Sequence, residues 1–199
     1  VNPNLGIVLF NGSVVYMPWK DKVKAIFKAG LPGENGGTAI ANLLYGDTNP
    51  SARLSETYIN DLKINPSYLN YGDHRIVYYK ESNYVGYRYY GMNDIPVAYP
   101  FGYGLSYTTF KYSNLNISLE KDVIDVSFDI KNTGNRPGKE TIQIYFSAPS
   151  SKIARPEREL IEIDKVFLDV NETKTLSYKI KVKDLSYFNV YTKKFEIEN

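Results

Sequence analysis

From residue 112 onward, apolar and polar residues of the chain alternate with a period of two. The alternation is clearest in residues 123–130, 141–146 and 175–182, where every second side chain is apolar. Because successive side chains of a strand point to opposite faces, this period predicts strands with one face on a core and the other in water. A turn signal, Asn-Thr-Gly-Asn at 132–135, separates the first two. Several such strands at short spacing predict an antiparallel β-sandwich.

The first part of the chain has a different pattern, which indicates α/β structure. Residues 5–9 form a short apolar run, typical of a parallel strand buried on both faces. Residues 20–29 carry apolar side chains at i, i+3 and i+4 and predict a helix that ends at Gly30. Residues 36–45 predict a second helix. The chain is therefore expected to be α/β first and all-β second, with a boundary near residue 110.

Between residues 46 and 110 no periodicity persists, and Gly, Pro, Asn, Asp and Tyr dominate. So long an irregular segment is uncommon in a compact protein and is usually functional or packed on another domain. The chain contains 19 Tyr and 9 Phe, and the aromatic residues in this segment argue against disorder. We interpret the segment as an ordered arm that crosses a surface. For any single tyrosine, sheet packing is favoured over stacking on a sugar.

The composition excludes several classes of site. Cysteine is absent, so the chain forms neither a disulfide nor a thiolate metal site. His74 is the single histidine, which excludes a histidine-rich zinc or iron site. The net charge of +2 gives no field that attracts nucleic acid, and no apolar run reaches the length of a membrane-spanning helix. We expect no cofactor, no metal, no nucleic-acid partner and no membrane partner.

Three blocks of sequence carry a resemblance to one family of enzymes. The first has MPW at residues 17–19, LPGENGGTAIA at 31–41 and YGDTNPSARL at 45–54; the second has GYRYY at 86–90 and YPFGYGLSYTTF at 99–110; the third has KNTG at 131–134 and RPEREL at 155–160. The run at 99–110 is the most specific of them. Together the blocks resemble glycoside hydrolase family 3, of the β-glucosidase type, and they cover nearly the whole chain.

The resemblance implies a fold and its division into domains. The expected fold class is α/β (partial α/β sandwich domain) followed by an all-β fibronectin type III-like (Ig-like) sandwich. Residues 1–70 would be the C-terminal part of the α/β sandwich domain and residues 71–110 an extended aromatic-rich connector. Residues 111–199 would be the fibronectin type III-like β-sandwich, lacking its last strand. Departures from the family pattern, such as Ala52 where glycine is usual, leave the substrate unassigned.

The resemblance also implies a function for the protein as a whole. Family members of this type are retaining hydrolases of terminal β-D-glucosides, with an aspartate nucleophile in a TIM barrel and a glutamate acid/base upstream of the block at 17–19. No acidic residue here matches either motif, so we expect no catalytic residue in this chain, and no substrate-binding residue is assigned.

The chain would buttress a TIM-barrel catalytic domain in the same or another chain and be inactive alone. The parent enzyme as a whole, and not this chain alone, would bind the substrate, a β-glucoside or an oligosaccharide. Two alternatives stay open: the specificity of a β-xylosidase or related exo-glycosidase, and a non-catalytic carbohydrate-binding or structural β-sandwich module.

Residues that could carry chemistry of their own have simpler structural explanations. Retention needs two carboxyl groups about 5–5.5 Å apart, and the acidic candidates for such a pair are Glu34, Asp47, Glu56, Asp61, Asp73 and Glu81. Turns and helix starts explain acids of this kind, so we expect none to be catalytic. His74 lacks a recognisable nucleophile motif and is expected to be a surface residue. Arg88 is expected to anchor the arm through a carboxylate rather than reach the rim of the barrel's active site.

The ends of the chain prompt a further expectation. Residues 193–197 predict a sandwich strand, and in the family at least one more strand normally follows. Because an unpaired strand edge invites association, we expect another chain or a longer polypeptide to complete this piece. No signal peptide is visible in the segment, and its cellular location stays open. The N-x-S/T patterns at Asn11, Asn116 and Asn171 are weak glycosylation signals that depend on the host.

Overall fold

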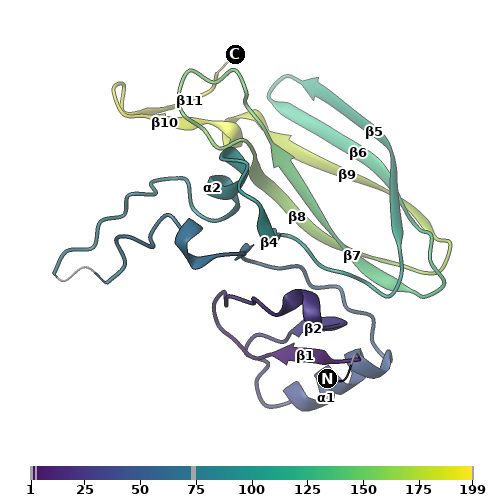
Figure 1. Ribbon diagram of the computed structural model, residues 1–199. Coiled ribbons are helices and arrows are strands. Elements are labelled where there is room, and N and C mark those ends of the chain that lie inside the picture. Colours follow the sequence, from purple (N-terminus) through teal and green to yellow (C-terminus); the bar gives the residue numbers. More distant parts are fainter. Residues whose placement is uncertain (1, 3, 73–74, 199) are drawn as a thin grey trace. The chain divides into compact units, whose positions relative to one another are not determined.

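The computed structural model describes residues 2, 4–72 and 75–198 and divides into two compact units (Figure 1). The first unit contains Val1–Thr48 and Ala52–Leu105, and the second contains Asn49–Ser51 and Ser106–Asn199. Strands dominate the chain, with few helices. Two of the candidate residues, Asp73 and His74, lie outside the described residues.

The first unit combines short strands with short helices. β1 (Gly6–Leu9) and β2 (Ala25–Lys28) pair in parallel, and β3 (Tyr58–Ile59) and β4 (Val97–Tyr99) pair antiparallel. The α-helices are α1 (Gly36–Tyr45) and α2 (Tyr87–Met92), and the 3-10 helices are η1 (Lys20–Lys22) and η2 (Leu62–Ile64). Its buried apolar side chains are Met17, Tyr58, Ile59 and Tyr90. Within the described residues this unit therefore encloses only a small core.

Two predictions for this unit are confirmed at the level of the element. The helix over residues 36–45 is α1, and it ends at Gly46, whose φ of 83° is left-handed and whose N–H donates to the carbonyl of Leu43. Glycine reaches this conformation without a Cβ penalty. The strand over residues 5–9 is β1, which pairs in parallel as expected. Its residues are exposed or half-buried, so the predicted burial on both faces is not found within the described chain.

The predicted helix over residues 20–29 is wrong. The structure has the single 3-10 turn η1 followed by β2, which pairs with β1 from Gly6 opposite Ala25 onward. Two further backbone bonds of 2.8 Å extend the pair: Lys24 N donates to the carbonyl of Leu5, and Ala29 N to that of Leu9. A short apolar run fits a helix and a strand equally well. The free edge of β1 satisfies the backbone groups of β2, and this tertiary pairing decides between them.

The second unit is built from antiparallel strands. β5 (Phe110–Glu120), β6 (Val123–Asn132) and β9 (Thr173–Lys181) form one sheet in the order β5-β6-β9, and β7 (Gly138–Phe146) pairs with β8 (Glu159–Leu168). After the 3-10 helix η3 (Val182–Leu185), β10 (Tyr187–Asn189) and β11 (Lys194–Glu196) form a hairpin. The three segments with a period of two lie in β6, β7 and β9, so the predicted strands are confirmed, except that Val182 belongs to η3.

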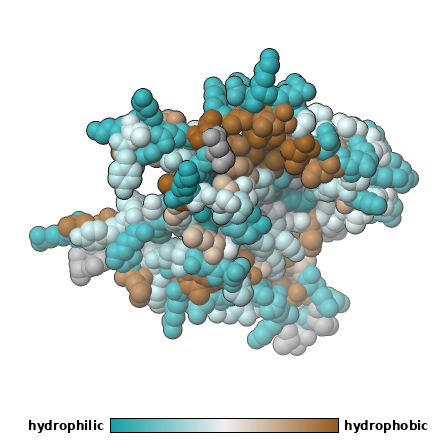
Figure 2. All heavy atoms as spheres, turned by 90° about the horizontal axis from the view of Figure 1, so that it is seen from above, coloured by the Kyte–Doolittle hydropathy of each residue, from teal (hydrophilic) through white to brown (hydrophobic). Residues whose placement is uncertain are grey.

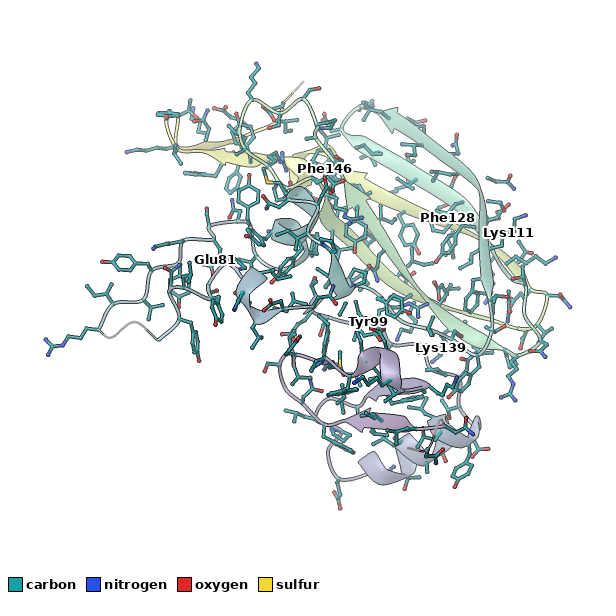
Figure 3. The ribbon with its side chains drawn as sticks, viewed as in Figure 1. Glu81, Tyr99, Lys111, Phe128, Lys139 and Phe146 are labelled. Carbon is teal, nitrogen blue, oxygen red and sulfur yellow. The ribbon has the colours of Figure 1, made fainter. Side chains whose placement is uncertain are left out.

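The apolar rows of the strands meet in one core. Phe128 is labelled in Figure 3. It stands opposite Leu176 in the β6–β9 pair and belongs to the same core cluster as Ile142 of β7 and Leu168 of β8. Its ring lies 6.0 Å from that of Tyr178, in a stacked arrangement. Full burial of a large apolar side chain stabilises a fold by about 1.5–3 kcal/mol. The core residues therefore hold both sheets together.

One part of the inner face of this unit is not covered within the described chain. Ile117 and Leu119 of β5 stand opposite Val126 and Ile124 of β6, on the face that forms the core, yet they are 61% and 64% exposed. On the face seen from above, Figure 2 shows one larger patch of hydrophobic side chains and several smaller, separate groups. An exposed apolar area of this kind marks a surface that packs against something else.

The strand predicted over residues 193–197 is present as β11, and its partner is β10 in a separate two-stranded hairpin. Phe188 and Phe195 stand opposite each other in the hairpin, with ring centroids 5.4 Å apart. Among the described helices, none has the length and apolar character needed to cross a membrane.

Candidate functional site

The acidic candidates in the described part of the chain are engaged locally or exposed. Glu34, Asp47 and Glu56 are exposed, and Asp61 accepts a hydrogen bond of 2.9 Å from the backbone N of Lys63 at the start of η2. These are the positions of capping and turn residues. They support the structural interpretation of the four acids, and the absence of a catalytic residue stays a prediction.

Glu81 has a different environment, which also argues against proton donation. Its carboxylate accepts a hydrogen bond from the hydroxyl of Ser67, and this bond lowers the pKa of Glu81 from its usual value. A general acid of a glycosidase needs a raised pKa. Glu81 lies in the irregular segment (Figure 3). Lys80 beside it donates to the side chain of Asn70. These two bonds join Ser67 and Asn70 to Glu81 and Lys80.

Arg88, the candidate anchor, lies in α2 against an aromatic ring. Its guanidinium is 5.9 Å from the ring centroid of Tyr87, a cation–π arrangement. In the part of the chain that the structure describes, no carboxylate pairs with it. The expected carboxylate anchor therefore stays a prediction.

The first and second sequence blocks meet directly. Leu54 donates from its backbone N to the carbonyl of Tyr103 and accepts from Gly102 N, both at 2.8 Å. A Cβ at Gly104 would lie 2.8 Å from the carbonyl oxygen of Ala52, closer than real Cβ contacts come. Gly104, the second glycine of the Phe-Gly-Tyr-Gly run, is thus required because the backbone of residues 52–54 lies too close to leave room for a side chain.

Aromatic rings surround this junction. Tyr87 stacks on Phe101 with centroids 4.9 Å apart, and Tyr99 lies 5.2 Å from Tyr103. Burial raises the pKa of Tyr58 and of Tyr90 above the usual value of a phenol. Such phenols stay neutral and act as packing groups, so the structure supports packing as the main use of these aromatic residues.

The third block contains a buried polar centre that the sequence analysis did not identify. Asn132 is 0% exposed. Its Oδ1 accepts from Thr108 Oγ1 at 2.6 Å and from Gly134 N at 3.1 Å, while its Nδ2 donates to the carbonyls of Arg136 at 2.8 Å and Leu168 at 3.2 Å. The signal was available: Asn132 is in phase with the core-facing residues of β6, where a polar residue needs partners.

Within each unit, the described contacts of these blocks hold chain segments together. The three blocks contribute tight turns, ring stacks and buried amide bonds, which are structural contacts. Among the described residues, no group of three or more His, Cys, Asp or Glu side chains is placed to hold a metal ion. The function is therefore inferred from the similarity of this chain to known proteins.

Two family models match the chain. Residues 1–107 match the Glycosyl hydrolase family 3 C-terminal domain, and residues 140–199 match the Fibronectin type III-like domain. Among curated relatives, the Thermostable beta-glucosidase B of Acetivibrio thermocellus is 44% identical over 205 residues, which cover 100% of this chain and 27% of the relative. The Beta-glucosidase of Kluyveromyces marxianus is 43% identical over 201 residues, covering 99% of this chain and 24% of the relative.

The solved structures that are similar to this chain are also beta-glucosidases. The Kluyveromyces marxianus beta-glucosidase in complex with glucose superposes with a TM-score of 0.94 at 42% identity, covering 99% of this chain and 24% of that one. Beta-glucosidase 3B of Thermotoga neapolitana in complex with glucose has a TM-score of 0.89 at 40% identity, covering 94% and 27%. The chain spans about a quarter of the length of these proteins. The resemblance found in the sequence blocks is confirmed: the chain belongs to glycosyl hydrolase family 3, and it carries the C-terminal domain of that family and a fibronectin type III-like domain.

Proposed function

We propose that this chain is the C-terminal portion of a retaining glycosidase that acts on terminal β-D-glucosides, and that it supports the catalytic domain without carrying the nucleophile or the acid/base. One observation carries the proposal: beta-glucosidases match the chain over 99–100% of its length but over only 24–27% of their own. The rest of such a protein has ample length for a catalytic barrel.

The domain division is part of the proposal. Residues 1–70 are the C-terminal part of an α/β sandwich domain, 71–110 a connector, and 111–199 a fibronectin type III-like sandwich. The parallel β1–β2 pair, whose residues are exposed or half-buried, is consistent with an incomplete α/β layer. The uncovered Ile117 and Leu119 are consistent with a sandwich that lacks a strand. In the longer protein, a further strand would cover this part of the inner face.

The catalytic carboxyl groups lie outside the chain in this proposal. A retaining mechanism needs a nucleophile and a general acid about 5–5.5 Å apart, with a raised pKa on the acid. Of the five described acidic candidates, four are exposed and Glu81 has a lowered pKa. The TIM barrel supplies the nucleophile, and this chain buttresses the barrel.

An activity comparison tests the proposal. The chain 1–199 and the longer protein are assayed side by side with an aryl β-D-glucoside, and the first-formed anomer is followed by NMR. We expect no turnover by the chain and release of the β-anomer by the longer protein. The variant Glu81→Gln of the longer protein is expected to keep its activity. Turnover by the chain alone, or first release of the α-anomer, would contradict the proposal. If the corresponding aryl β-D-xyloside is cleaved faster than the glucoside, the specificity is that of a β-xylosidase.

A carbohydrate-binding module is the second candidate function, because the β10–β11 hairpin presents an exposed aromatic residue on an ordered turn. Tyr191 is 93% exposed, and its backbone N donates to Asn189 Oδ1 at 2.9 Å. Aromatic rings on rigid turns are suited to stacking on sugars, and the ordering costs little extra entropy. Titration of the chain with soluble glucans tests this function. Binding that is lost in Tyr191→Ala would support it, and a flat titration removes it.

A further inference from the structure

A tripeptide from the first sequence block belongs to the second unit. Asn49–Ser51 lies in the sequence between two stretches of the first unit, yet its contacts place it with residues 106–199. The chain therefore passes between the units three times: after Thr48, after Ser51 and after Leu105. We call Asn49-Pro50-Ser51 the strap.

The side chain of Asn49 is bonded at both its ends. Its Oδ1 accepts from Ser106 Oγ and from the backbone N of Tyr107, each at 2.9 Å. Its Nδ2 donates to the carbonyl of Pro137 at 3.0 Å. Only a primary amide offers an acceptor and a donor in this geometry. Asn49 thus joins the segment that leads into β5 to the segment that leads into β7.

Ser51 makes the second set of contacts, to a pair of residues that stand opposite each other in β7 and β8. Thr141 Oγ1 donates to the carbonyl of Ser51 at 2.9 Å, and Lys165 Nζ lies 3.4 Å from its hydroxyl. Pro50, between the two bonded residues, has a fixed φ, so the strap loses less conformational entropy when it is held.

The site is also shaped to admit the amide of Asn49. A Cβ at Gly138, the first residue of β7, would lie 2.5 Å from Asn49 Nδ2 and 3.0 Å from Thr108 Cγ2. Glycine at this position is therefore explained by the close approach of the strap and not by its backbone conformation. A connection that merely passed over this surface would need neither this gap nor bonds from its side chains.

We propose that the strap is a tether built into the fold. It fills a fitted site on the second unit, called here the sandwich unit, and it stabilises the segments that lead into β5 and β7. The sandwich unit is then not self-sufficient in its continuous sequence 106–199. It needs three residues that precede it by more than fifty positions in the chain. This inference is independent of the catalytic function proposed for the longer protein.

Hydrogen exchange of the full chain tests the tether. In Asn49→Ala we expect peptides covering 106–108 and 136–141 to exchange roughly 100-fold faster, the loss expected for three hydrogen bonds. Asn49→Asp keeps the acceptor but loses the donor to Pro137, so we expect a smaller increase in the same peptides. Asn35→Ala, an exposed asparagine without a side-chain capping bond, is the matched control and should exchange as the wild type does.

Two further measurements keep the test decisive if Asn49→Ala does not fold. Ser106→Ala removes two bonds, the one to Asn49 and the one that Ser106 Oγ accepts from Thr108 N at 3.3 Å. Its effect on the strap is therefore measured in the peptide covering 136–141, where exchange should rise by roughly tenfold. The fluorescence of Trp19, the single tryptophan, reports on the first unit and should keep its melting midpoint in Ser106→Ala. Exchange in Asn49→Asp and Ser106→Ala equal to that of Asn35→Ala would overturn the proposal, because the strap would then be a passive connection.

Discussion

Replacing Asn132 by alanine removes four hydrogen bonds from the interior of the sandwich unit. The bonds run to Thr108, Gly134, Arg136 and Leu168 and have lengths of 2.6–3.2 Å, and the residue is 0% exposed. Each hydrogen bond contributes about 0.5–1.5 kcal/mol, and a buried partner left without one costs about 1–3 kcal/mol. We therefore expect Asn132→Ala to lower the free energy of unfolding by about 3–5 kcal/mol.

Urea unfolding followed by far-UV circular dichroism measures this change. For a unit of this size an m-value of about 1–3 kcal/mol per molar urea turns the loss into a midpoint lower by about 2 M. Asn116→Ala is the matched control: Asn116 lies in β5 of the same sheet with an exposed side chain, and surface substitutions change stability by about 0.5 kcal/mol or less. A loss below about 1 kcal/mol in Asn132→Ala would refute the reasoning, because the four bonds would then add almost nothing over bonds to water.

Three further predictions concern the same unit. Gly134→Ala brings a Cβ to 2.9 Å from the backbone N of Thr109 and should cost about 2 kcal/mol in urea unfolding, whereas Gly37→Ala, with open space around it, should be neutral or stabilising. Phe128→Ala, at a buried core position, should cost about 3–5 kcal/mol by the same measurement. A hydrogen bond from Thr175 and one from Asn114 lower the pKa of Asp129. Its contribution to stability is therefore present at neutral pH and lost as the pH falls below about 4. The urea midpoint of Asp129→Asn should lie below that of the wild type at neutral pH and by less in acid, and an equal difference at both pH values would contradict this assignment.

The strands of the sandwich unit could be predicted from the sequence because their signal is local. In β6 the side chains of Val126, Phe128 and Ile130 alternate with polar ones, and each faces the core. The prediction of a helix over residues 20–29 was wrong because the structure there depends on a non-local contact. The apolar spacing of this segment fits a helix, and the strand β2 forms because β1, far away in the sequence, offers a parallel edge.

The buried polar contacts could be predicted only in part. The phase of Asn132 within β6 places a polar side chain toward the core, but its partners Thr108 and Leu168 come from distant segments that only the fold brings together. The same holds for Asn49, whose sequence context indicates a turn. That no catalytic pair lies in this chain stays a prediction. It rests on the family resemblance, in which no acidic residue matches either catalytic motif, and not on geometry.

The location of the catalytic nucleophile tests the central claim most directly. A 2-deoxy-2-fluoro-β-D-glucoside with a good leaving group traps the covalent intermediate of a retaining β-glucosidase, and peptide mass spectrometry finds the labelled residue. We predict one label on the longer protein, attached to an aspartate outside residues 1–199, and no label on the isolated chain. A label on any acidic residue within 1–199, Glu81 or Glu56 for example, would contradict the account.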